Sequence, residues 1–256
     1  AKVLKKGAVL EGDGTDANGA WFHWSAIQQK AGSVSLPSAI KPDSTNYGKV
    51  WYPNMAFGDS VLASQQIVLF RNATVWTNEK EGIIRGADVL VVGGKIKEVS
   101  RQRLTAPTGA RVIEAAGLHL TSGIIDEHSH IAISKGVNEG GQAISAEVSI
   151  ADVVNPDDID IYRQLAGGVT AAQLLHGSAN PIGGQSALIK LKWGMSPDDM
   201  LIDNAPKFIK FALGENVKQA NWGDFNTVRF PQTRMGVEQV FYDGFYRAKH
   251  YQKEWD

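Results

Sequence analysis

Cysteine is absent from the 256-residue chain, which excludes disulfide bonds and thiolate metal ligands. A chain without thiols is compatible with an exported protein and with a cytosolic one, so the compartment stays open. An excess of one charge is also lacking, since 26 basic and 27 acidic residues give a formal net charge of −1. This balance gives no indication of a nucleic-acid or membrane-surface partner. No apolar run approaches the roughly 20 residues that span a bilayer.

Residues 1–65 are rich in Gly, Ser, Asn and Trp and have no helical period, so we interpret them as β or irregular structure. The segment 11–20 has some features of a calcium loop, but Gly14 and Ser25 stand where an EF-hand needs oxygen ligands. A polar turn between strands is the better interpretation. The chain opens without Met and ends inside an expected helix, which indicates a piece of a longer chain or a mature form without its leader.

The pattern changes twice after residue 65. Short β-branched and aromatic runs separated by Asn/Gly turns predict a small antiparallel unit over residues 66–120. From residue 121 strands and helices alternate, which favours parallel strands with helical crossovers. A helix is expected to start at Asn155-Pro-Asp-Asp158 and to end at Gly167, and strands are expected at 169–175, 186–191 and 208–213. A last helix carries the apolar stripe of Val237, Val240, Phe241, Phe245, Ala248 and Tyr251.

The run Ile125-Asp-Glu-His-Ser-His130 carries the clearest chemical signal. Alternate side chains of a strand share a face, so Asp126, His128 and His130 point the same way. Two imidazoles on one face can converge on a metal ion. They follow the apolar start of the strand, and the C-terminal ends of parallel barrel strands are where active sites lie. Two surface histidines at a strand end are the alternative, and the surrounding pattern favours the metal site.

The stretch from Ala116 to His130, with Gly123-Ile-Ile-Asp-Glu-His-Ser-His130 at its end, resembles the signature of the amidohydrolase superfamily, close to its imidazolonepropionase-like and prolidase-like members. The segment 87–99 resembles the N-terminal β-sandwich of that family, and 168–180 resembles its second barrel strand and loop. The likeness covers residues 66–256. One departure is Ser122, where the family usually has proline. The implied fold is α/β plus β, with part of a composite β-sandwich (66–120) followed by the first half of a (β/α)8 TIM-like barrel (121–256), and residues 1–65 stay unplaced.

The resemblance implies that His128 and His130 bind one or two divalent metal ions, most often Zn²⁺. In the family a carboxylated Lys or a Glu bridges the metals, two further His follow, and a last-strand Asp protonates the leaving nitrogen. Glu215 at the end of the expected strand 208–213 is preferred as the bridging group, with Lys210 as the alternative, since strand alternation allows only one of them to reach the metal. The last-strand Asp cannot be assigned in this chain.

Four residues are candidates for substrate binding. His176, Ser178 and Asn180 lie in a Gly-rich loop after an apolar strand, where a barrel contacts its substrate. Arg234 opens the last helix and could pair with a substrate carboxylate. The alternatives are an ordinary Gly-rich turn for the loop and a bond to neighbouring carbonyls for Arg234.

Three readings of the function follow. In the first, the chain is part of a metal-dependent hydrolase of amide C–N bonds, acting on a small amide or a dipeptide and completed by the remaining C-terminal part of the barrel. In the second, it is a half-barrel without catalytic activity that serves as a binding or structural module. In the third, the chain is a β-rich module in which the His-x-His pair is a coincidence. We prefer the first, because a barrel takes about 250 residues and only residues 121–256 are available for it. A homo-oligomer stays open, and the substrate is not readable.

Overall fold

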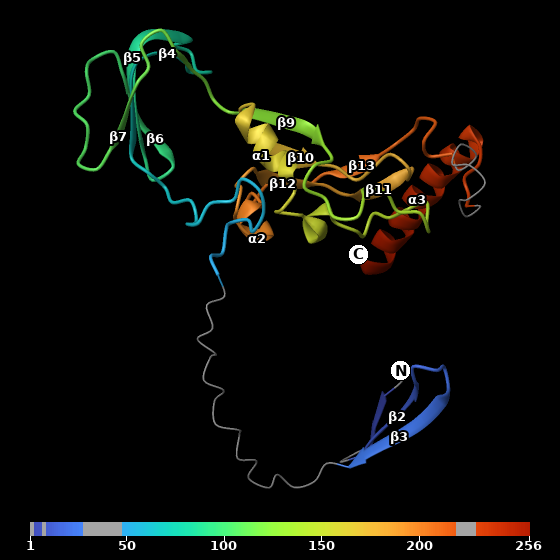
Figure 1. The fold of residues 1–256 in the computed structure, drawn as a ribbon. Coiled ribbons are helices and arrows are strands. Elements are labelled where there is room, and N and C mark those ends of the chain that lie inside the picture. Colours follow the sequence, from blue (N-terminus) through green and yellow to red (C-terminus); the bar gives the residue numbers. More distant parts are fainter. Residues whose placement is uncertain (1–2, 7–8, 28–47, 219–228) are drawn as a thin grey trace. The chain divides into compact units, whose positions relative to one another are not determined.

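The structure is a computed structural model, and it describes residues 3–6, 9–27, 48–218 and 229–256 (Figure 1). The chain divides into two compact units, Ala1–Gly48 and Lys49–Asp256. Among the described residues, no helix has the length and apolar character needed to cross a bilayer.

The first unit is a three-stranded antiparallel sheet. Strands β1 (Val3–Lys6), β2 (Val9–Thr15) and β3 (Trp21–Ile27) follow one another in the order of the sequence. Between β2 and β3 the carboxylate of Asp16 accepts hydrogen bonds from two backbone N–H groups of the turn, each at 2.9 Å. The interpretation of this segment as a polar turn between strands is therefore confirmed.

A five-stranded sheet comes next along the chain. It comprises β4 (Val68–Trp76), β5 (Ile83–Val92), β6 (Lys95–Ser100), β7 (Arg111–Glu114) and β8 (His119–Leu120). The predicted strands are confirmed, but the expectation of a purely antiparallel unit is wrong, because β7 and β8 both pair parallel to β4. The connection over residues 101–110 is long enough to bring the chain from the end of β6 back to the opposite end of the sheet, so that β7 can run parallel to β4. A tight turn would have made β7 antiparallel to the strand before it.

Strands β9 (Ile124–Ser129) and β10 (Val169–Leu174) pair in parallel and are joined through helix α1 (Ile159–Ala166), as expected. The helix starts later than predicted. Asn155 accepts a hydrogen bond from the N–H of Asp157 in a turn of its own, and Asp158 is the N-cap, because its carboxylate accepts the N–H of Asp160 at 3.0 Å. Gly167 caps the C-terminus, as predicted.

The strands expected at 186–191 and 208–213 are found, but a further strand covers 182–185, where a Gly-rich loop was expected, and the arrangement also differs from the expected one. Strand β12 (Ala187–Lys190) pairs antiparallel with β10, and β11 (Ile182–Gln185) pairs antiparallel with β13 (Ile209–Phe211). The prediction of parallel strands with helical crossovers is wrong here, because only the four-residue helix α2 (Pro197–Met200) lies between these strands, and such connections do not carry the chain across a sheet. The described residues form a mixed α/β structure with several small sheets and no closed barrel.

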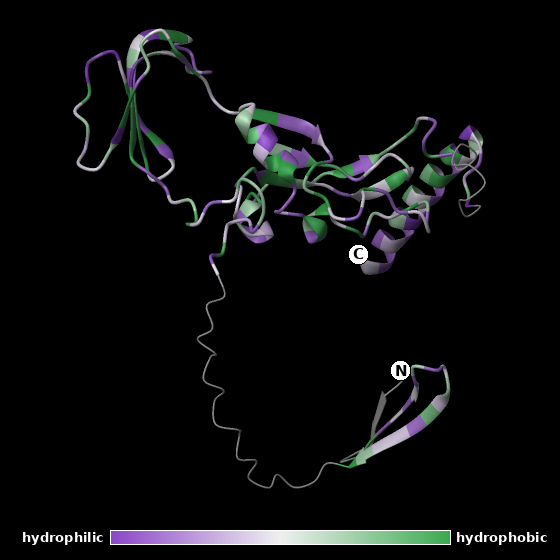
Figure 2. Cartoon of the chain, in the orientation of Figure 1, coloured by the Kyte–Doolittle hydropathy of each residue, from purple (hydrophilic) through white to green (hydrophobic). Residues whose placement is uncertain are grey.

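The core of this part lies between α1 and the β9–β10–β12 sheet. Ile161 from α1 and Leu174 and Ile189 from the strands are fully buried. Hydrophobic residues gather where α1, β10 and β12 meet (Figure 2). The last helix, α3 (Arg234–Trp255), begins after the N-cap Thr233, and Val237 and Val240 of the predicted stripe are buried.

The segment that precedes the five-stranded sheet packs on α1. Phe57 stacks on Tyr162 with ring centroids 4.6 Å apart. The indole N–H of Trp193 donates to the carbonyl of Phe57 at 2.8 Å. Residues 49–63 therefore form a strap that links α1 to the loop after β12.

Candidate functional site

The histidine pair lies at the C-terminal end of β9. Alternation along the strand places both imidazoles on one side, and the ring centroids of His128 and His130 are 5.4 Å apart at an interplanar angle of 83°. The N–H of His128 donates to the carboxylate of Asp126 at 3.2 Å, so this acidic side chain supports the backbone beside the pair. Both rings are solvent-accessible and so open to a ligand.

The ring of His130 is oriented by the neighbouring strand. Its Nδ1 donates to the carbonyl of Leu175 at 2.9 Å, which fixes the proton on Nδ1 and leaves the lone pair of Nε2 free to bind a metal. Partial burial lowers the pKa of His130, the carbonyl of Leu175 opposes that effect, and the charges of His128, Lys210 and His176 lower it further. The neutral imidazole, which is the form that binds metals, is therefore favoured.

The two candidates for a bridging ligand have different surroundings. Glu215 is half exposed and its carboxylate forms ion pairs with Lys218, at 2.6 Å, and with Arg234. Lys210 lies in the middle of β13, is partly buried, and contributes electrostatically to the titration of His130. The structure therefore engages Glu215 with two cations and brings the charge of Lys210 to the histidine pair.

His176 lies directly after β10 and is almost fully buried. Its Nδ1 donates to the carbonyl of Gly177 at 3.0 Å. The ring fits against two glycines of β11, because a Cβ would come within 2.9 Å of the imidazole at both Gly183 and Gly184. The Gly-Gly pair of the predicted loop therefore makes room for a buried histidine.

The other loop candidates make internal contacts. Asn180 is fully buried, and its amide N–H groups donate to the carbonyls of Glu139 and Gln142 at 2.9 and 2.7 Å. Its carboxamide oxygen accepts the N–H of Glu139 at 3.2 Å. The half-buried hydroxyl of Ser178 accepts from Asn216 at 2.9 Å. In this structure both side chains hold loops together at the C-terminal ends of the strands.

Sequence reasoning missed the loop at 137–142 that Asn180 holds, and it missed Arg229. The guanidinium of Arg229 is buried and bonds to carbonyls of this loop and of the turn after β10. Burial lowers the pKa of Arg229, and the carboxylate of Glu139 opposes this shift. The Gly140-Gly141 pair signals a loop, but no sequence signal connects it to an arginine so distant in the chain.

The donor set fits part of a metal centre. Two imidazoles share one face, and the hydrogen bond to Leu175 leaves the His130 ring ready to coordinate through Nε2. Within the described ranges, no third His, Cys, Asp or Glu joins them in a group able to hold an ion. The pair therefore provides two coordination positions, and a further donor is needed to complete the site.

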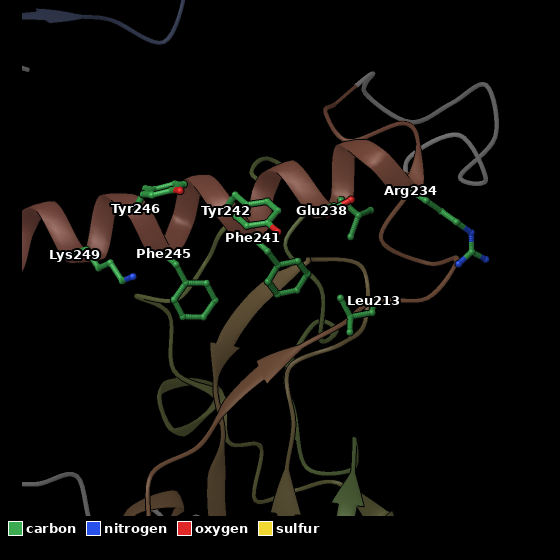
Figure 3. Close-up of a pocket in the computed structure, with 9 residues that line it drawn as sticks. Leu213, Arg234, Glu238, Phe241, Tyr242, Phe245, Tyr246 and Lys249 are labelled. Atoms are coloured by element: carbon green, nitrogen blue, oxygen red, sulfur yellow. The ribbon is translucent and has the colours of Figure 1, made fainter.

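Arg234 lies at one end of an apolar groove along α3 (Figure 3). The groove has a volume of about 530 Å³ and Leu213 lines it on the side facing the helix. Phe241 and Phe245 project from α3 toward the strand below it (Figure 3). Phe245 is 54% exposed and Leu213 is 70% exposed, so this surface is apolar and open.

Comparison with known proteins places the chain. No protein-family model matches it. It is 35% identical over 212 residues to the amidohydrolase tasK of Hapsidospora irregularis, a match that covers 70% of this chain and 21% of the relative. A dihydroorotase of Geobacter sulfurreducens is 32% identical over 112 residues, which is 40% of this chain and 26% of that protein.

Among solved structures, an amidohydrolase from Thermotoga maritima superposes with a TM-score of 0.62 at 35% identity, and the match covers 73% of this chain and 49% of that one. The chain thus spans about a fifth of tasK and about half of the Thermotoga protein. The fold is a partial amidohydrolase-like fold. With these similarities, the chain belongs to the amidohydrolase superfamily.

Proposed function

We propose that this chain contributes the first metal-binding strand of a metal-dependent hydrolase that cleaves amide C–N bonds. The observation that carries the proposal is the geometry of the pair on β9. His128 and His130 face the same side, and the Nδ1 of His130 is already committed to the carbonyl of Leu175. Histidines that bind metals usually donate their other ring N–H to a backbone carbonyl or a carboxylate in this way.

We propose Lys210 rather than Glu215 as the next ligand. Glu215 is neutralised by Lys218 and Arg234, so its recruitment to a metal would leave two cations without that partner. The charge of Lys210 already acts on His130. The ammonium of a lysine first loses a proton, and the free amine then adds to carbon dioxide with release of a second proton, which gives a carbamate anion whose oxygens can bind a metal.

A bound divalent ion, with Zn²⁺ the best match to imidazole donors, would activate water and polarise the amide carbonyl. The chain's own residues orient the site. His130 is held against β10, and the imidazole of His176 is buried against the two glycines of β11. The polar loops after β9 and β10 lie where a barrel receives its substrate, which we expect to be a small amide or a dipeptide.

The further polypeptide that completes the site is proposed to dock on the α3 groove. The groove has Phe241 and Phe245 as its aromatic wall and is open in this structure. A match to 49% of the Thermotoga relative is consistent with a second half of comparable size. Exposed apolar surface of this kind marks an interface. Co-expression with the unmatched half of that relative should give a complex that Phe245→Glu abolishes, whereas self-association of the chain alone through this groove would overturn the proposed occupant.

A non-catalytic binding or structural module is the second candidate. It is favoured because, within the part of the chain that the structure describes, no third His, Cys, Asp or Glu forms with the pair a group able to hold a metal ion. The two candidates differ in whether the completed, metal-loaded site hydrolyses an amide.

Zinc binding, measured by competition with a chromogenic chelator, tests the proposal. The chain should bind Zn²⁺, His128→Ala should abolish binding, and His250→Ala should leave it unchanged, because His250 lies exposed on α3 beside Glu254. Bicarbonate should raise the affinity of the wild type but not of Lys210→Met, and Glu215→Gln should behave as the wild type. A chain that binds no zinc would refute the metal proposal. Loss of affinity in Glu215→Gln alone would assign the ligand to Glu215.

Hydrolysis is tested separately, on the zinc-loaded protein together with its proposed second half. Dipeptides and N-acyl amino acids are the first substrates to screen. Turnover that depends on His128 would support the enzymatic reading, and zinc binding without turnover of any amide would favour the binding module.

A further inference from the structure

Two loops lie side by side after β9 and β10. They are the loop at 137–142 and the turn at 176–180. The N–H of Gly177 donates to the carbonyl of Val137 at 2.5 Å. The side chain of Asn138 also packs directly on Gly177, where a Cβ would come within 1.9 Å of its side-chain oxygen. These contacts between Gly177 and residues 137–138 hold the two loops together.

Arg229 joins these two loops from a third part of the chain. One nitrogen of its guanidinium donates to the carbonyl of Gln142, and another donates to the carbonyl of Ala179 at 3.1 Å. Arg229 is 8% exposed, and its bond to Ala179 is buried, whereas its bond to Gln142 is partly buried. Glu139, in the first loop, provides the negative charge that acts on this cation.

We propose that Arg229 is a positioning residue that clasps the loop at 137–142 to the turn at 176–180 and thereby sets the metal site. The turn begins directly after Leu175, whose carbonyl orients the ring of His130. It also contains His176 itself. Displacement of the turn would therefore move both groups relative to β9.

The chemistry of arginine suits this role. The planar guanidinium presents several N–H donors in a fixed fork and can satisfy two carbonyls from different loops at once. A lysine at 229 has a single nitrogen on a flexible stem, so it would satisfy one carbonyl well and the other poorly. The proposal rests on the metal site proposed above, but the clasp itself can be measured without any metal.

Amide hydrogen exchange of the metal-free chain tests the clasp. In Arg229→Ala the N–H groups of Gly177 and Ala179 should exchange about 10- to 100-fold faster. Hydrogen bonds to a charged group contribute enough free energy to raise the population of the locally open state by about that factor when they are lost. The N–H of Leu191, which donates to Thr170 in the β10–β12 sheet, should be unaffected. The matched control is Arg163→Ala, which removes an exposed arginine paired with Asp160 on α1.

Rescue separates positioning from a general loss of folding. Methylguanidinium at millimolar concentration should restore protection in Arg229→Ala and have no effect on Asn180→Ala. Arg229→Lys should restore protection only in part. Unchanged exchange, or an equal rise at Leu191 and at Gly177 without rescue, would overturn the clasp.

Zinc titration then tests the link to the site. Arg229→Ala should weaken zinc binding several-fold, with recovery on addition of methylguanidinium. A loosened loop with unchanged zinc affinity would overturn the positioning role while leaving the metal proposal standing. If the wild type binds no zinc, the proposed function fails, and the exchange data still decide whether the clasp exists.

Discussion

A methyl group at Gly184 is predicted to displace the buried imidazole of His176. The new Cβ would lie 2.9 Å from the Cδ2 of His176, 2.6 Å from a methyl carbon of Val148 and 2.9 Å from the Val148 carbonyl oxygen. The side chains can shift, but the backbone carbonyl is fixed by its hydrogen bond from the N–H of Gln185 at 2.8 Å. Overpacking of this kind costs about 1–3 kcal/mol. The lower entropy of the unfolded Ala chain offsets about 0.4–1 kcal/mol, so we expect a net loss of about 1–2 kcal/mol in the free energy of unfolding.

The control for this prediction is Gly214→Ala. A Cβ at Gly214 has no atom within 4 Å, and the residue does not have a left-handed backbone, so this variant should be neutral or slightly more stable. Urea unfolding followed by circular dichroism compares the two variants, and the imidazole resonances in NMR spectra report whether His176 has moved. Equal stability of Gly184→Ala and Gly214→Ala, with an unshifted His176 signal, would refute the packing argument.

Three further predictions concern other parts of the chain. Burial tends to raise the pKa of Asp88, but two backbone N–H groups and two arginines hold it below its ordinary value, so its contribution to stability should be complete above about pH 5 and be lost as the pH falls through the lower folded pKa. Asp88→Asn should cost about 1–3 kcal/mol near neutral pH and lose this acid dependence, as urea unfolding at several pH values would show. Trp193→Phe removes the hydrogen bond to the carbonyl of Phe57, so chymotrypsin should cleave the strap faster than in the wild type. An unchanged cleavage rate would mean that the stacking of Phe57 on Tyr162 is enough to hold the strap. Thr233→Ala removes the N-cap of α3 and should cost about 1 kcal/mol, measured as faster amide exchange in the first turn of that helix but not in its middle.

Features that depend on neighbouring residues could be predicted from the sequence. Alternation from Asp126 to His130 predicted two imidazoles on one side of a strand, and they lie there. Gly167 ends α1 as predicted, because a helix end depends only on the adjacent turn. The start of α1 was placed too early, since both Asn155 and Asp158 are suitable caps. In the structure the carboxylate of Asp158 also accepts a hydrogen bond from the N–H of Ala132, at 2.7 Å, a tertiary contact that the sequence does not show.

Strand direction and long-range contacts could not be predicted in the same way. The run at 186–191 has the composition of a buried strand whichever way it pairs, and its antiparallel pairing with β10 follows from the connection rather than from the strand. Arg229 has no local pattern at all. Its significance comes from two carbonyls that lie 50 and 87 positions earlier in the chain. Such contacts are set by the packed structure and not by residue spacing.

Of the two histidines, only His130 has its ring held by a contact from a neighbouring strand within the part of the chain that the structure describes. His130 is oriented by the carbonyl of Leu175 at 2.9 Å, which comes from the neighbouring strand. His128 lies on β9, an edge of the three-stranded sheet, where Ile124 and Ile125 are 57% and 68% exposed. Strands of parallel α/β folds are normally covered on both faces. Because a metal ligand has to be held within about 0.5 Å of its working position, covering this edge should order His128 far more than His130. The asymmetry between the two rings therefore predicts that the further polypeptide, besides docking on the α3 groove, has to cover the open edge of β9.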